Sequence, residues 1–120
     1  MASYKSLLVY KKAFELAMEI FEISKRFPKE ETYSLTDQIR RSSRSVCANF
    51  AEAYRRRKYP AHFMSKLSDS DAENAETEVW LDFSFACKYI TNDEYKLLLA
   101  KKDEVGRLLG DIIKNPDKYT

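Results

Sequence analysis

The sequence predicts an all-α fold, a single antiparallel up-down-up-down four-helix bundle that spans residues 1–120. The 120 residues include only two glycines and three prolines, and such a composition favours long helices over turn-rich sheets. Apolar residues recur at helical spacing in four long segments, and the short connections between these segments force neighbouring helices to run antiparallel. The length suits one domain with one core.

The first helix is expected over residues 5–26, because Pro28 follows and ends it. This segment carries two neighbouring apolar stripes, although one stripe would be enough to cover a core. The second stripe therefore indicates burial on two sides. One stripe comprises Tyr10, Phe14, Ala17 and Phe21, and the other comprises Val9, Ala13, Leu16, Ile20, Ile23 and Phe27.

The second helix is expected to start at Ser34, whose hydroxyl can cap the helix together with Asp37 three residues later. Tyr59 and Pro60 form the break that ends it. Its serines and alanines permit a close approach of neighbouring helices. The inward face comprises Leu35, Ile39, Ser42, Ser43, Val46, Phe50, Ala53 and Tyr54.

The third helix is expected over residues 60–89, with Pro60 in its first turn. The middle of its inward stripe is polar, which predicts a hydrogen-bonded layer at the centre of the core. The stripe comprises Phe63, Leu67, Ser70, Asn74, Thr77, Leu81 and Phe85.

The fourth helix is expected to follow a capping box between Thr91 and Glu94 and to end before Asn115. Gly106 and Gly110 form a GxxxG spacing, which in a soluble helix is more typical of a tight helix crossing than of a dimer contact. The inward residues are Leu98, Val105, Leu109 and Ile112.

The net charge of +2 is unremarkable, so an argument for nucleic-acid binding must rest on how the charges are distributed. Residues 40–58 carry seven cations and one acid, whereas residues 60–90 carry two cations and six acids. A hairpin folded at residues 59–60 brings these segments together. We therefore expect ion pairs between the arginines Arg40, Arg41 and Arg44 and the glutamates Glu73, Glu76 and Glu78.

The end of the second helix differs, because residues 55–58 lie opposite residues 61–64, where there is no acid. The topology brings the start of the first helix and the end of the fourth to the same end, which should be strongly basic. Exposed aromatic residues there, such as Tyr4, Tyr59 or Tyr119, could stack on unpaired bases. The alternative is a solvated tip that only aids solubility. The candidate nucleic-acid contacts are Arg55, Arg56, Arg57, Lys58, Lys66, Lys11 and Lys12, with Arg40, Arg41 and Arg44 in second place.

The residues needed for catalysis are missing, so we expect no enzymatic activity, no cofactor and no metal site. His62 is the sole histidine, and the sequence has no CxxC, HExxH or glycine-rich phosphate loop. Glu73 and Glu76 have the spacing of a di-iron ligand pair but lack the histidines such a site uses.

The cysteines and the apolar segments predict a cytoplasmic protein that does not contact membranes. Cys47 and Cys87 stand alone in helical patterns and are expected to be small buried residues of a reduced protein. The amino-terminal residues lack the long apolar region of a signal peptide, and no apolar run reaches membrane-spanning length.

Several segments, in order along nearly the whole chain, match one family. They are residues 8–13 (LVYKKA), 27–31 (FPKEE), 35–43 (LTDQIRRSS) and 48–52 (ANFAE), followed by Glu76-Thr77 and Trp80-Leu81. The chain resembles the bacterial four-helix-bundle proteins encoded in intervening sequences of large-subunit ribosomal RNA genes. That family includes relatives of the accessory variability protein of diversity-generating retroelements. Family members commonly have glycine where this chain has Ala53, a change that fits a continuous helix.

The resemblance implies a ring-like homopentamer with a cationic surface. In the retroelement relatives it also implies binding to a reverse transcriptase and its RNA. A ring would explain the second apolar stripe of the first helix as the contact between subunits, with Val9, Leu16, Ile20 and Ile23 as the candidate residues.

The function predicted from these observations is that of a non-enzymatic, self-associating bundle that binds RNA or other nucleic acid through its basic end. The alternative is a protein-interaction scaffold with no nucleic-acid role, in which cations and acids of neighbouring subunits pair. A third class, a bundle that binds a small molecule or metal, would need a cavity lined by Ser70, Asn74, Thr77 and Cys47.

Overall fold

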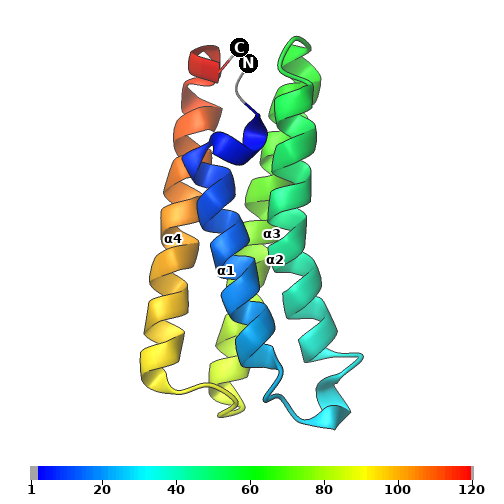
Figure 1. The fold of residues 1–120 in the computed structure, drawn as a ribbon, viewed down its shortest axis with the longest axis vertical. Coiled ribbons are helices and arrows are strands. Elements are labelled where there is room, and N and C mark those ends of the chain that lie inside the picture. The colour runs from blue at the N-terminus through cyan, green and yellow to red at the C-terminus, as the bar shows by residue number, and fades with distance from the viewer. Residues whose placement is uncertain (1–2, 120) are drawn as a thin grey trace.

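The computed structural model describes residues 3–119 and contains four long helices. They are α1 (Leu8–Ser24), α2 (Leu35–Arg55), α3 (Pro60–Ala86) and α4 (Asn92–Lys114). Short 3-10 turns lie at Tyr4–Ser6, Lys29–Glu31 and Pro116–Tyr119, and no strand occurs within residues 3–119. The helices run side by side along the longest axis of the molecule, which measures 44 × 25 × 22 Å (Figure 1).

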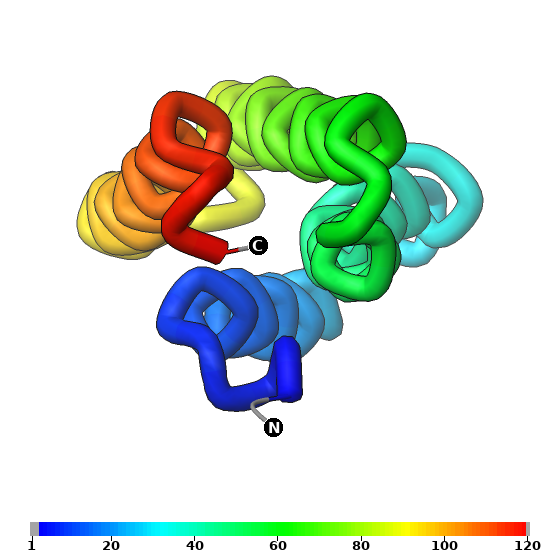
Figure 2. The backbone as a smooth tube through the Cα atoms, turned by 90° about the horizontal axis from the view of Figure 1, so that it is seen from above, coloured from blue at the N-terminus to red at the C-terminus, as the bar shows by residue number. Residues whose placement is uncertain are grey.

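Each helix packs against the next one in the chain, and α4 closes the bundle against α1. Viewed down the axis, the four helices surround a shared centre (Figure 2). The predicted all-α bundle is therefore confirmed. Both chain termini and the α2–α3 turn lie at the same end of the bundle (Figure 1).

The core consists of two apolar clusters, one toward each end of the bundle. The cluster near the termini includes Phe50, Phe63 and Leu109, and the other includes Ile20, Ile39 and Leu81. The inward residues predicted for α4, Leu98, Val105, Leu109 and Ile112, are all buried.

Buried polar side chains lie along α3 between these clusters and donate hydrogen bonds to neighbouring helices. Ser70 donates to the backbone oxygen of Val46 at 2.8 Å, and Thr77 donates to Oγ of Ser42 at 2.9 Å. Asn74 donates to the backbone oxygen of Lys102 at 3.1 Å. The predicted polar layer is thus present, and its hydrogen bonds connect α3 to both α2 and α4.

The two predicted helix caps have different outcomes. The capping box of α4 is present: Glu94 N–H donates to Oγ1 of Thr91 at 3.1 Å, and Thr91 N–H donates to Oε1 of Glu94 at 2.8 Å. The prediction that the Ser34 side chain caps α2 is wrong. The backbone of Ser34 (φ −126°, ψ −107°) lies outside the extended region that a capping residue adopts, and its side chain makes no capping hydrogen bond. Glu31 replaces it by accepting a hydrogen bond from Leu35 N–H at 3.3 Å.

The assignment of Val9, Leu16 and Ile20 to a contact between subunits is corrected by the structure, whereas that of Ile23 stays a prediction. The first three are at most 4% exposed and face the chain's own core, and Ile23 packs partly buried against it. Periodicity reveals two apolar faces on one helix without telling which of them faces the bundle. The large apolar side chains that α1 leaves exposed are Leu8, Phe14 and Met18.

The carboxyl-terminal end of α3 is shorter than predicted. Lys88 adopts φ 65°, a left-handed conformation that terminates the helix soon after Ala86. Ser84 occupies the buried position, whereas Phe85, predicted to point inward, is exposed and stacks on Tyr95 with 4.5 Å between ring centroids. Within residues 3–119, no helix combines the length and the apolar character needed to cross a bilayer.

Candidate nucleic-acid interface

The end of the bundle that holds both termini and the α2–α3 turn is strongly cationic, and we call it the basic end. It comprises residues 3–15, 52–66 and 107–119, which together contain eleven Lys or Arg residues and four Asp or Glu residues. The whole chain has 21 and 19, so the remainder of the molecule carries an excess of acids. These three segments lie together in Figure 1, so the bundle is polarised along its axis.

Of the four consecutive cations at residues 55–58, Arg55, Arg56 and Lys58 are exposed and lie more than 4.0 Å from every carboxylate of residues 3–119. The nearby acids Glu52 and Asp111 instead form ion pairs with Lys66 and Lys118. Cations in the last turn of a helix interact favourably with its dipole, which gives this arrangement a structural role as well. Their charges nevertheless remain available to an anion outside the chain.

Arg57 is the exception among the four consecutive cations. Its guanidinium carbon lies 3.6 Å from the centroid of the Tyr54 ring, and Nε donates to the backbone oxygen of Tyr54 at 2.7 Å. Nη1 also donates to the backbone oxygen of Tyr119 at 3.4 Å, which ties the end of α2 to the carboxyl-terminal turn. These contacts give Arg57 a structural role, so its side chain is not free like those of its neighbours.

Of the three other lysines predicted to contact nucleic acid, Lys66 and Lys12 form ion pairs, whereas Lys11 does not. Lys66 lies 2.8 Å from Glu52 and 3.8 Å from Asp69, and the hydrogen bond to Glu52 raises its pKa. Lys12 lies 3.5 Å from Glu104 across α1 and α4. Lys11 is exposed and has no carboxylate within 4.0 Å in the described part of the chain. Lys11 therefore joins the three free cations of the α2 end.

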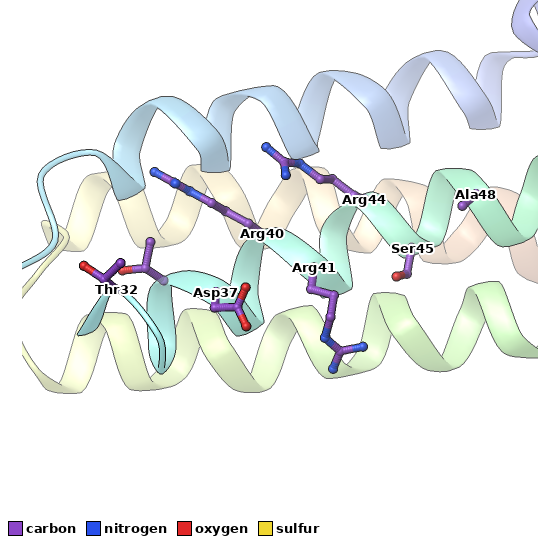
Figure 3. A pocket seen from close by; sticks show the side chains of 8 residues that line it. Thr32, Asp37, Arg40, Arg41, Arg44, Ser45 and Ala48 are labelled. Carbon is purple, nitrogen blue, oxygen red and sulfur yellow. The ribbon is translucent and has the colours of Figure 1, made fainter. Parts of the chain in front are cut away.

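The second group of candidates, Arg40, Arg41 and Arg44, lines a groove on the outer side of α2. Arg40 and Arg44 extend toward α1, whereas Arg41 extends toward α3 (Figure 3). Arg41 pairs with Glu76 at 3.7 Å, as predicted.

The predicted ion pairs of Arg40 and Arg44 with acids on α3 are wrong. Their guanidinium carbons lie 4.9 and 5.6 Å from the centroid of the Phe21 ring on α1. Arg40 also donates from Nε to Oγ of Ser24 at 2.7 Å. A guanidinium is weakly hydrated and stacks readily on aromatic faces, so Phe21 competes with the carboxylates. Sequence reasoning missed Phe21, whose only signal was an aromatic residue at the border of an apolar stripe.

The other candidates from the sequence are metal-ligating side chains and the two cysteines. No group of three metal-ligating side chains lies close together within residues 3–119. Cys47 is buried, and burial raises its pKa to about 11, so the thiol is protonated and unreactive at neutral pH. Cys87 is exposed, contrary to the prediction that both cysteines are buried, because α3 ends before it.

Comparisons with known proteins identify the family. Residues 5–111 match the family model described as 23S rRNA-intervening sequence protein. The chain belongs to this family. The match covers α1, α2, α3 and α4 as far as Asp111, and it includes the cations of the basic end on α1 and α2.

A crystal structure of similar fold comes from Bacteroides thetaiotaomicron, a protein of unknown function from the S23 ribosomal protein family. The two chains are 33% identical with a TM-score of 0.82, and the similarity covers 90% of this chain and 96% of the other. No curated protein matches the chain. The 23S rRNA-intervening sequence family and its fold are thus established, while the activity has to be argued from the basic end.

Proposed function

We propose that this family member is a non-enzymatic, self-associating protein that binds RNA or other nucleic acid through phosphate contacts at its basic end. The observation that carries the proposal is the group of free cations, Arg55, Arg56, Lys58 and Lys11, at an end with eleven cations and four acids. Each cation that neutralises a phosphate releases a condensed counterion, so a few such contacts produce measurable affinity.

Self-association would strengthen these contacts. Copies assembled into a ring, for which the family resemblance suggests a pentamer, would present several basic ends to one polyanion, and the contacts would act together. The exposed apolar residues Leu8, Phe14 and Met18 on α1 supply a surface for such assembly. We further propose a cytoplasmic location, which the two free thiols support, and a reverse transcriptase as one candidate protein partner.

The test is a fluorescence-anisotropy titration of a labelled RNA across a range of salt concentrations. Affinity should fall steeply between about 50 and 200 mM salt. Replacing Arg55, Arg56 and Lys58 together by glutamine should reduce the slope of log affinity against log salt by about 2–3, because three phosphate contacts are lost.

The matched control is the triple glutamine variant of Lys29, Lys88 and Lys96, which removes the same charge from the opposite end of the bundle. It should bind like the wild type. If the wild-type protein fails to bind RNA even at low salt, the proposed function is wrong. If both triple variants lose the same affinity, overall charge and not the basic end is responsible.

The second candidate function is a protein-interaction scaffold, and a groove at the opposite end favours it. Tyr33 is 93% exposed there and lines the groove with Trp80, Phe83 and Cys87. Light scattering and RNA titration on a Phe83→Lys variant, which places a charge in this groove, discriminate the two functions. Loss of the oligomer with no change in RNA binding would favour the scaffold.

A further inference from the structure

Five tyrosines lie at the basic end, Tyr4, Tyr10, Tyr54, Tyr59 and Tyr119, and four of them pack against the adjacent apolar cluster. Tyr4 packs edge-on against Tyr10 with 5.0 Å between ring centroids, and both Tyr4 and Tyr119 rest against the adjacent apolar cluster. Tyr59 belongs to neither apolar cluster, and its side chain is 58% exposed. Tyr59 is therefore the tyrosine of this group whose ring is open to solvent.

The backbone holds Tyr59 in place although its side chain is exposed. Its N–H donates to the backbone oxygen of Arg56 at 2.9 Å, and its carbonyl accepts from Phe63 N–H at 2.9 Å. Pro60 follows and restricts the backbone of the residue before it. A ring attached to a fixed backbone loses little conformational entropy when a ligand binds it.

The side chain of Tyr59 contributes neither to an apolar cluster nor to a helix cap. It is the N-cap residue of α3 but makes no capping hydrogen bond. The ring of His62 lies perpendicular to it, with an interplanar angle of 88° and 6.4 Å between centroids. Arg56 and Lys58, two of the free cations, flank it in the same turn. An exposed aromatic ring is thus held beside positive charges that lack carboxylate partners.

This combination matches the two parts of an unpaired nucleotide, a charged phosphate and a flat base. In a duplex the faces of the bases are stacked on each other, and the outer surface presents chiefly phosphates. In a single strand, a loop or a bulge the base faces are open and stack on aromatic side chains. Cations alone would bind both forms, and they require no aromatic ring.

We propose that the basic end prefers unpaired nucleotides to duplex and that Tyr59 is the platform on which a base stacks. This inference rests on the nucleic-acid binding proposed above and adds the class of substrate. Arg55, Arg56 and Lys58 hold the phosphates, and the ring of Tyr59 supplies the discrimination between single strand and duplex.

The experiment compares a labelled oligouridine of about 12 nucleotides with an RNA duplex of the same length, titrated at one salt concentration. The variants are Tyr59→Ala and Tyr59→Phe, and the control is Tyr33→Ala, which removes an even more exposed tyrosine from the opposite end. Tyr59→Ala should weaken single-strand binding by about 5- to 100-fold while duplex binding changes less than about twofold. Tyr59→Phe should bind like the wild type because it keeps the ring, and Tyr33→Ala should change neither affinity.

The salt slope separates stacking from phosphate contact. Tyr59→Ala should leave the slope for the single strand unchanged, because the phosphate contacts remain. Circular dichroism should show an intact fold, since the alanine variant loses no capping hydrogen bond.

Three results would overturn the inference: an unchanged single-strand affinity, an equal loss for duplex, or an altered oligomer mass that makes Tyr59 a contact between copies. In the first two cases, wild-type binding with a steep salt dependence leaves the proposed function standing. If the wild type binds neither RNA, both proposals are wrong.

Discussion

The consecutive cations at the end of α2 look alike in the sequence, yet they differ in physical role. Successive residues of a helix are rotated by about 100°, so neighbouring arginines meet different surroundings. Arg57 meets the ring of Tyr54 at 3.6 Å and two backbone oxygens, whereas Arg56 meets solvent. A guanidinium that already stacks and donates hydrogen bonds contributes to stability and has less to offer a phosphate.

Alanine substitutions should separate these roles. Arg57→Ala should lower the free energy of unfolding by about 1–2 kcal/mol, the sum of a cation–π contact and a hydrogen bond. Arg56→Ala should change it by less than about 0.5 kcal/mol but should reduce the salt slope of RNA binding. Urea unfolding and anisotropy on both variants check this, and a loss of RNA binding confined to Arg57→Ala would contradict the assignment.

At the scale of the helix, the two glycines of the GxxxG spacing on α4 have different surroundings. A Cβ atom at Gly106 would lie 3.3 Å from the side-chain nitrogen of Asn74, which is buried and bonded to Lys102. A Cβ atom at Gly110 would meet nothing within 4 Å. The close helix approach expected from the spacing is therefore present at Gly106 and absent at Gly110.

Gly110→Ala should raise the free energy of unfolding by about 0.5–1 kcal/mol, because alanine restricts the unfolded chain and favours the helix. Gly106→Ala should gain less or should destabilise, since the Asn74 amide cannot move away without losing its hydrogen bond. Urea denaturation with an unchanged m-value measures both. Equal stabilisation at the two positions would argue against the tight contact, and a smaller oligomer for Gly110→Ala would place that glycine between copies.

The helices and their inward faces were largely predictable, because hydrophobic spacing and capping motifs are local. The capping box at Thr91 and the polar layer of Ser70, Asn74 and Thr77 were both anticipated and are present. The partners of Arg40 and Arg44 were not predicted, because a long flexible side chain can reach groups on different helices. The choice between Phe21 and an α3 carboxylate depends on tertiary geometry that no local pattern encodes.

At the scale of the whole molecule, the two ends of the bundle act as separate electrostatic surfaces. The bundle is 44 Å long, whereas the Debye length at physiological ionic strength is about 8 Å. Exposed charges at the opposite end therefore do not cancel the potential at the basic end. This separation allows a chain with a net charge of only +2 to present a strongly cationic surface.

Self-association would bring several such ends together, and the exposed part of α1 is the surface to test. Phe14 is 51% exposed and lines grooves on both sides of it, one with Tyr4, Met18 and Ala48 and one with Lys5 and Lys11. Phe14→Lys should leave the subunit folded, because the side chain lies outside the core, but should prevent a contact that buries it. Light scattering should then report a mass near the 14.1 kDa of one chain.

The lysine also makes the RNA result decisive. One added positive charge at the basic end should by itself strengthen phosphate binding. A weaker RNA affinity for Phe14→Lys, by about 10- to 100-fold, can therefore be ascribed to the loss of multivalent contact. Leu97→Lys, on α4 and similarly exposed at 54%, adds the same charge far from this surface and should keep both the mass and the affinity of the wild type. If Phe14→Lys keeps the wild-type mass, this face of α1 is not where the copies meet.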